Sequence, residues 1–207
     1  MSAAEYRAPA AVGEAELTEK RSKFIGFVCP ISSEDEAKAE IARIRTKYHD
    51  ARHHAWCYIT GGIERYSDDG EPQGTAGMPM LEIFRRGGIT NVVSVVTRYF
   101  GGILLGPGGL SRAYSGAAKL ALDAAGITLY RLWDSMDIAC PYNLAERIKI
   151  EIEARGGTVA DIEYGAEVII HAALPQGVAE GLNSRIIDMS AGAVTGIITG
   201  QQFAAER

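Results

Sequence analysis

The sequence lacks long apolar runs and paired cysteines. No stretch approaches the ~18 consecutive apolar residues of a membrane span. The three cysteines, Cys29, Cys57 and Cys140, form no Cys-x-x-Cys motif, which argues against a disulfide scaffold or a structural zinc site. The first twenty residues lack the basic start and apolar stretch of a secretory signal. We therefore expect a cytoplasmic protein with reduced thiols, no bound metal and no membrane partner.

Charge is unevenly distributed along the 207 residues, whose net charge is −5. Residues 1–134 contain 16 Lys or Arg and 16 Asp or Glu, whereas residues 135–207 contain 5 and 10. All of the excess negative charge falls in the second part, which repels the phosphates of a nucleic acid. Any affinity for RNA or ribosomes is accordingly predicted for residues 1–134.

The first part of the chain predicts a mixed α+β domain. Apolar patterns indicate strands over residues 23–30, 55–60 and 91–97. Ser33 and Glu36 have the spacing of a capping box and predict a helix to about residue 47. A short helix is expected over residues 78–84, and a longer one ending at Gly126. Residues 1–20 suggest a loose arm or edge segment, and residues 65–75 a polar loop.

The second part predicts the order β-α-β-β-α-β, which is the ferredoxin-like pattern. The expected strands are residues 136–140, 158–164, 167–174 and 193–199, and Pro141 and Pro175 open the two helices. Among these strands only Tyr164 is aromatic. We therefore predict an α+β protein with domains 1–134 and 135–207, divided after the strand-like residues 127–133. In each domain, helices are expected to cover one face of a sheet.

Three long segments carry a family resemblance: KRSKFIG at 20–26, ERYSDDGEPQGTAGMPMLE at 64–82 and TNVVSVVTRYFGGILLGPGGLSRAYSGAAKLAL at 90–122. Over residues 17–126 the sequence resembles the YigZ/IMPACT family. The resemblance implies a ribosomal-protein-like α+β first domain and a ferredoxin-like second domain, similar to a late domain of elongation factor G. It also implies a link to translation, because the eukaryotic relative regulates translation under amino-acid starvation through protein partners and ribosomes. The sequence departs from the family pattern at Pro107, usually Thr, and at Arg52-His53-His54, usually Thr-His-Asn.

The segment FGGILLGPGGLSRAY, residues 100–114, is rich in glycine and opens a predicted helix. Glycines permit close backbone approach, and free N–H groups at a helix start attract anions. An anion site here would use Arg98, Gly108, Gly109, Ser111 and Arg112. The segment lacks the Lys of a phosphate-binding P-loop and the spacing of a dinucleotide fingerprint, so no cofactor is predicted. A tight strand-to-helix connection explains the glycines equally well.

The polar loop at residues 65–75 holds three carboxylates. Asp68 is assigned to ordinary turn chemistry, whereas Asp69 and Glu71 remain open between turn and site. His53, matching the family histidine, either lines a pocket or is hydrogen-bonded at a strand start. Cys57 carries no sign of activation, so no catalytic residue is assigned.

These segments lead to one functional hypothesis and one alternative. Loop 65–75, residues 98–109 and the following helix start are predicted to form one anion-binding pocket, with Tyr99 beside Arg98 at the strand end and His53 lining it. The protein is then a translation-linked regulatory or binding protein that contacts ribosome, RNA or a protein factor through its first domain. The alternative is a small-molecule or phosphoester enzyme that uses Asp69, Glu71 and His53. The sequence does not fix the oligomeric state.

Overall fold

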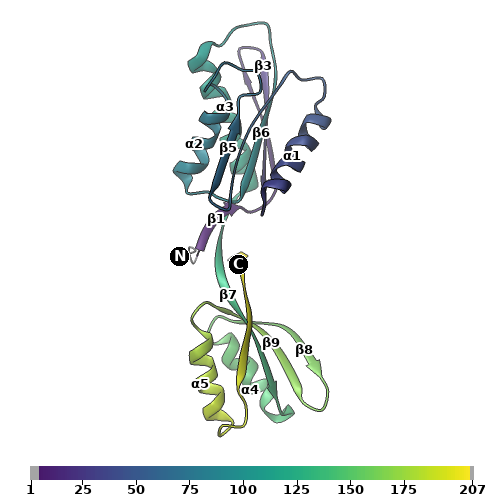
Figure 1. The fold of residues 1–207 in the computed structure, drawn as a ribbon, viewed down its shortest axis with the longest axis vertical. Helices are drawn as coiled ribbons and strands as arrows, with labels where there is room; N and C mark the ends of the chain where they lie inside the picture. Colours follow the sequence, from purple (N-terminus) through teal and green to yellow (C-terminus); the bar gives the residue numbers. More distant parts are fainter. Residues whose placement is uncertain (1–4, 206–207) are drawn as a thin grey trace. The chain divides into compact units, whose positions relative to one another are not determined.

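The computed structural model describes residues 5–205. The described chain forms two compact units: the N-terminal unit, Tyr6–Leu129, and the C-terminal unit, from Tyr130 onward together with Glu5 (Figure 1). Both units combine helices with an antiparallel sheet, which confirms the predicted α+β class. Within residues 5–205, no helix is both long and apolar enough to cross a membrane.

The sheet of the N-terminal unit has the strand order β2-β3-β6-β4-β5. Its strands are β2 (Gly13–Glu19), β3 (Ser22–Pro30), β4 (His53–Thr60), β5 (Ile63–Ser67) and β6 (Val92–Tyr99). The central strand β6 is buried from Val92 to Arg98, as its continuous β-branched run predicts. Of the two alternatives for residues 1–20, a loose arm or an edge segment, the described part agrees with the edge segment, since it contains β1 (Glu5–Pro9) and the edge strand β2. The polar loop expected over residues 65–75 begins only after β5.

Helices cover both faces of this sheet, which corrects the expectation of one covered face. Helix α1 (Glu34–Lys47) packs on one face against residues including Phe27, Tyr58 and Val95. Helices α2 (Gly77–Gly87) and α3 (Gly106–Ala125) pack on the other face (Figure 1). Ser33 caps α1 as predicted, because its Oγ accepts from the Glu36 backbone N–H at 3.2 Å. β6 therefore needs apolar side chains on both sides.

Helix α3 lies unusually close to β2 and β3. A Cβ atom added at Gly26 would lie 2.3 Å from the Ala117 carbonyl oxygen, and one at Gly13 would lie 2.2 Å from the Ala121 carbonyl oxygen. Both distances are far below van der Waals contact, so only glycine fits at these two strand positions. The alanines on this side of α3 complete the close approach. These contacts fix the C-terminal half of α3 against the sheet.

The C-terminal unit has the strand order β10-β7-β9-β8, and β1 also pairs with β7. Its elements are β7 (Ile127–Cys140), α4 (Tyr142–Glu153), β8 (Thr158–Tyr164), β9 (Val168–Pro175), α5 (Ala179–Met189) and β10 (Gly196–Ala205). This is the antiparallel order of a ferredoxin-like βαββαβ unit. Both helices pack on one face, against residues such as Met136, Ile138 and Ile170.

Three boundaries in this unit differ from the sequence prediction. β7 is one strand of 14 residues rather than two separate strands. α5 begins at Ala179, not at Pro175, because residues 176–178 form a turn. β10 continues beyond residue 199 to Ala205 and therefore includes Phe203. Trp133 and Phe203 are thus strand aromatics that the sequence interpretation missed.

Candidate functional site

The centre of the predicted site is a buried carboxylate, Glu71. Its side chain is 4% exposed, and its Oε1 accepts hydrogen bonds from Arg98 Nη1 and from the Tyr114 hydroxyl, both at 2.7 Å. These partners come from the end of β6 and from α3. Burial, followed by the nearby Glu71 charge, raises the pKa of Tyr114, so its hydroxyl stays a donor. Glu71 therefore joins the polar loop to the sheet and to α3.

Arg98 fills the space beside this carboxylate. Its side chain is 7% exposed, and its guanidinium carbon lies 5.5 Å from the Phe24 ring centre and 5.4 Å from the Phe100 ring centre. Cation–π attraction to both rings therefore stabilises Arg98 in addition to its ion pair with Glu71. Arg98 Nε has no hydrogen-bond partner among residues 5–205. The guanidinium is thus committed mainly to Glu71, although the sequence assigned it to an external anion.

Asp69 connects the polar loop to the start of β4 and to α1 through hydrogen bonds. Its Oδ2 accepts from the His54 backbone N–H at 2.7 Å, and its Oδ1 accepts from Arg45 Nη2 at 2.5 Å. Its carbonyl oxygen lies 2.9 Å from His53 Nδ1. Asp69 has a positive φ of 46°, a conformation in which aspartate is tolerated. These three contacts, one from α1 and two from the start of β4, define one loop conformation.

Asp68 has the turn role assigned to it. Its Oδ1 accepts from the backbone N–H groups of Ala76 and Gly77, and its Oδ2 accepts from that of Gly74. Two of these donors lie at the start of α2, where backbone N–H groups have no partner within the helix. The carboxylate satisfies them and also suits the positive end of the helix dipole.

The structure brings four predicted residues into one cluster: His53, Asp69, Glu71 and Arg98. Tyr99 points elsewhere, since its hydroxyl donates to Asp50 at 2.7 Å and this bond raises its pKa to about 12. Four other predicted residues, Gly108, Gly109, Ser111 and Arg112, lie in the first turns of α3. In the part of the chain that is described, no side-chain hydrogen bond links these four to Glu71 or Arg98. Arg112 instead lies along Gly108.

Two side chains near this cluster, Cys57 and His54, are of types that can act as a nucleophile or a base. Cys57 is 1% exposed, and burial raises the pKa of its thiol well above the usual range. His54 is also buried, which lowers its pKa, and its Nδ1 lies 3.0 Å from Thr97 Oγ1. Neither group reaches solvent in a reactive form.

Comparison with known proteins places this cluster within a recognised domain. A family model described as the Impact N-terminal domain matches residues 20–122, and one described as a domain of unknown function (DUF1949) matches residues 138–193. The IMPACT family member YigZ of Escherichia coli is 33% identical over 180 residues, which cover 84% of this chain and 88% of that protein. An IMPACT family member of Haemophilus influenzae is 33% identical over 203 residues, covering 91% and 94%. The chain belongs to the IMPACT family.

A solved structure resembles nearly the whole chain. A crystal structure described as that of a hypothetical protein has 31% sequence identity and a TM-score of 0.63, covering 95% of this chain and 98% of that one. The Glu71–Arg98 cluster lies inside the Impact N-terminal match.

The IMPACT-type unit also has a surface that sequence reasoning did not identify, which we call the loop end. Its apolar part is the connection from β6 to α3, where Phe100 is 55%, Ile103 40% and Leu104 83% exposed. Its charged part consists of four exposed cations, Lys20, Arg21, Arg52 and Arg112. The sequence alone does not reveal this surface, because its residues come from four separate segments that only the strand register of the folded sheet brings together.

Proposed function

We propose that this IMPACT-family chain is a translation-linked regulatory or binding protein whose loop end contacts RNA, including RNA in ribosomes. The observation that carries the proposal is the combination of exposed cations without acidic partners and an exposed aromatic residue. Phosphates are attracted by Lys and Arg, and unpaired bases stack on aromatic rings. A protein factor as the partner is an alternative outcome of the test below.

Strand pairing supports the grouping of these cations. Lys20 and Arg21 form the turn between β2 and β3, and this turn adjoins the end of β6 because Lys23 pairs with Tyr99. The Gly101 backbone N–H donates to Ser22 Oγ at 3.1 Å, which holds the apolar connection against the same turn. Arg52 precedes His53, whose pairing partner is Arg98. The connection then enters α3, which carries Arg112 (Figure 1).

The charge balance at the loop end is positive. Within residues 5–205, none of its four cations forms an ion pair. Nearby carboxylates are already paired: Glu71 with Arg98, Asp69 with Arg45, and Glu16 with Lys23 at 2.7 Å. Two exposed acids oppose the four cations: Glu19, the last residue of β2, and Asp50, which accepts a hydrogen bond from Tyr99.

Two other arginines of this unit, Arg85 and Arg86, are paired and lie away from the loop end. Arg85 bonds to both Glu64 and Glu82, and Arg86 lies 3.8 Å from Glu82. Both are in the last turn of α2, which leads into the start of β6 rather than its end. They therefore do not contribute to the loop end.

The enzyme alternative has less support from the geometry. A general base must reach a substrate proton with a free oxygen or nitrogen. Glu71 is buried and bonded to Arg98, and both Asp69 oxygens accept internal hydrogen bonds. These contacts suit a role in fixing the loop. In His53, by contrast, Nδ1 contacts the Asp69 carbonyl oxygen, whereas Nε2 forms no hydrogen bond within residues 5–205.

The test is binding of the full chain to single-stranded RNA and to ribosomes across a salt series. We expect affinity to fall steeply with salt. The Arg21→Ala/Arg112→Ala variant should weaken binding and reduce the salt slope by about 1.4, since each lost phosphate contact contributes about 0.7. The matched control, Arg85→Ala/Arg86→Ala, removes the same charge from α2 and should bind like the parent chain.

Other outcomes would overturn the proposal. Equal loss of affinity in both double variants would show that only net charge matters. Ribosome binding that is insensitive to salt and to ribonuclease would indicate a protein partner. Turnover of a phosphoester that Asp69→Asn abolishes, without RNA binding, would favour the enzyme.

A further inference from the structure

The C-terminal unit contains a pocket of about 840 Å³ that no predicted function uses. It lies on the sheet face that α4 and α5 leave uncovered. On this face Trp133 pairs with Pro175 of β9 and with Gln202 of β10. Ala173 and Ala204 line the pocket with short side chains, which leave space beside the larger indole ring of Trp133. The volume lies within the range of about 300–1,000 Å³ typical of small-molecule sites.

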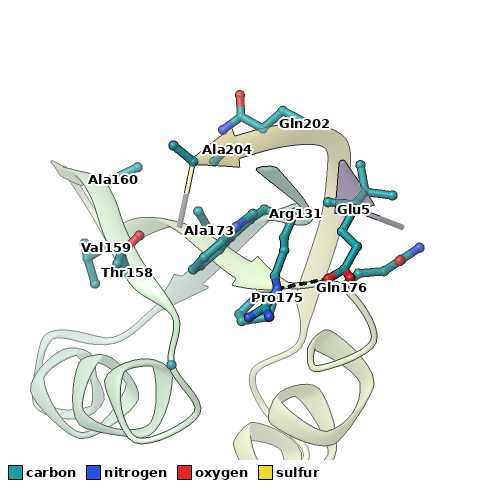
Figure 2. Close-up of a pocket in the computed structure, with 14 residues that line it drawn as sticks. Glu5, Arg131, Thr158, Val159, Ala160, Ala173, Pro175, Gln176, Gln202 and Ala204 are labelled. Carbon is teal, nitrogen blue, oxygen red and sulfur yellow. Dashed lines mark hydrogen bonds and ion pairs between the residues drawn. The ribbon is translucent and has the colours of Figure 1, made fainter. Parts of the chain in front are cut away.

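Figure 2 shows the walls of this pocket. The start of β8, with Thr158, Val159 and Ala160, lies on one side, and β10, with Gln202 and Ala204, lies across from it. Pro175 and Gln176 border the third side, where Arg131 and Glu5 close the rim. All of these residues belong to the C-terminal unit.

The polar groups of the pocket suit an uncharged, hydrogen-bonding ligand. The side chains of Thr158, Gln176 and Gln202 form no hydrogen bond within residues 5–205. Each carboxamide offers both a donor and an acceptor, and the threonine hydroxyl does the same. The half-buried Trp133 supplies an aromatic surface, and its Nε1 is a buried donor with no partner in the described chain. Such orphan donors are rare in cores and need an explanation.

The charges argue against a phosphate-rich ligand. Arg131 is the cation of the pocket, and its Nε lies 3.3 Å from Glu5 Oε2 in an ion pair. Elsewhere on the same sheet face, Asp137 and Glu163 flank His171. Residues 135–207 carry 10 acidic and 5 basic residues. A polyphosphate would meet net repulsion there, whereas a neutral ring would not.

We propose that this pocket binds a nucleobase, held by stacking on Trp133 and by hydrogen bonds to Gln176 and Gln202. A flat heterocycle with donors and acceptors on its edge matches a ring surface bordered by carboxamides. The charge argument favours a free nucleoside, which carries no phosphate, over a base of single-stranded RNA, and the experiment separates these two sources. The inference does not depend on the proposed function, because the loop end belongs to the other unit and its variants leave this pocket unchanged.

The experiment uses the full chain with Trp56→Phe, so that Trp133 is the sole tryptophan of a sequence that has two. Adenosine, guanosine, cytidine and uridine are titrated separately while Trp133 fluorescence is followed. Ribose 5-phosphate serves as the base-free probe, and a short single-stranded RNA represents the second source. We expect saturable quenching by at least one nucleoside below about 1 mM, the weak end of specific binding. Ribose 5-phosphate should have no effect.

Two matched variants locate the binding. Ala204→Leu fills the pocket without removing a polar group and should weaken nucleoside binding at least tenfold. Ala139→Leu adds the same volume on β7, outside the pocket lining, and should leave binding unchanged. If RNA binds more tightly than nucleosides and Ala204→Leu abolishes this, the base of a strand is the occupant. Absence of saturable quenching by every nucleoside and by RNA, or equal binding by both variants, would overturn the proposal.

Discussion

The buried ion pair between Glu71 and Arg98 gives the sharpest test of how the polar loop is held. The two side chains are 4% and 7% exposed, so removal of either partner leaves the other charge with little access to water. Such a change typically lowers the free energy of unfolding by about 3–5 kcal/mol, whereas replacing both charged residues lowers it much less. We therefore expect Arg98→Met and Glu71→Gln each to destabilise the N-terminal unit strongly. The double variant should be more stable than the sum of the single effects by about 1–3 kcal/mol.

Urea unfolding measures these differences. In a Trp133→Phe background, fluorescence reports only Trp56, which lies in β4 of the N-terminal unit. With a urea slope of about 2 kcal/mol per molar, each single change should lower the midpoint by roughly 2 M. Arg85→Met is the control: its side chain is 39% exposed and its pairs with Glu64 and Glu82 should contribute less than about 1 kcal/mol. A shift below about 0.5 M for Arg98→Met, or strictly additive effects, would refute the reasoning.

Three further outcomes follow from particular contacts. In the same assay Gly101→Ala should lower the free energy of unfolding by about 2–3 kcal/mol, because its Cβ would lie 2.0 Å from the backbone of the β2–β3 turn. The control Gly102→Ala, at a φ of 86° but with open space around it, should lower this free energy by only about 1–2 kcal/mol. The hydrogen bond to Asp137 raises the pKa of His171, so its stabilising contribution is complete below pH ~6.5 and is lost as pH rises through the raised value. An NMR titration should show that Asp137→Asn lowers this pKa, and no change would contradict the assignment. A thiol reagent should leave buried Cys57 unmodified in the native protein; labelling at the rate of an exposed thiol would count against it.

Local patterns predicted the elements whose residues satisfy one another nearby in sequence. The Ser33 cap fixes the start of α1, and the run at β6 indicates a strand buried on both faces. The βαββαβ order likewise led to the strand order of the C-terminal unit. β2 was missed because its glutamates and glycine weaken the strand pattern, and its glycine is explained only by contact with α3.

The candidate site could be predicted only in part, because its bonds link distant positions. Glu71 lies 27 residues from Arg98 and 43 from Tyr114, and no periodicity reports such a pairing. The sequence therefore placed Glu71 and Arg98 in one pocket but treated them as free to bind a ligand. Trp133 was overlooked for a related reason. It was assigned to a junction, whereas it lies in a continuous strand and lines a pocket.

The glycine contacts beneath α3 also have a consequence for biosynthesis. β3 pairs with β2 and β6, and Gly13 and Gly26 pack on residues 117–125 of α3. The ribosome makes about 5–20 residues per second, so the β2–β3 segment leaves the exit tunnel roughly 5–20 s before the end of α3 does. During most of that interval Phe24 of β3 has neither the neighbouring strand β6 nor its covering helix α3. We expect the nascent chain to be most vulnerable to aggregation and most dependent on chaperones in this window, which closes when residue 125 leaves the exit tunnel.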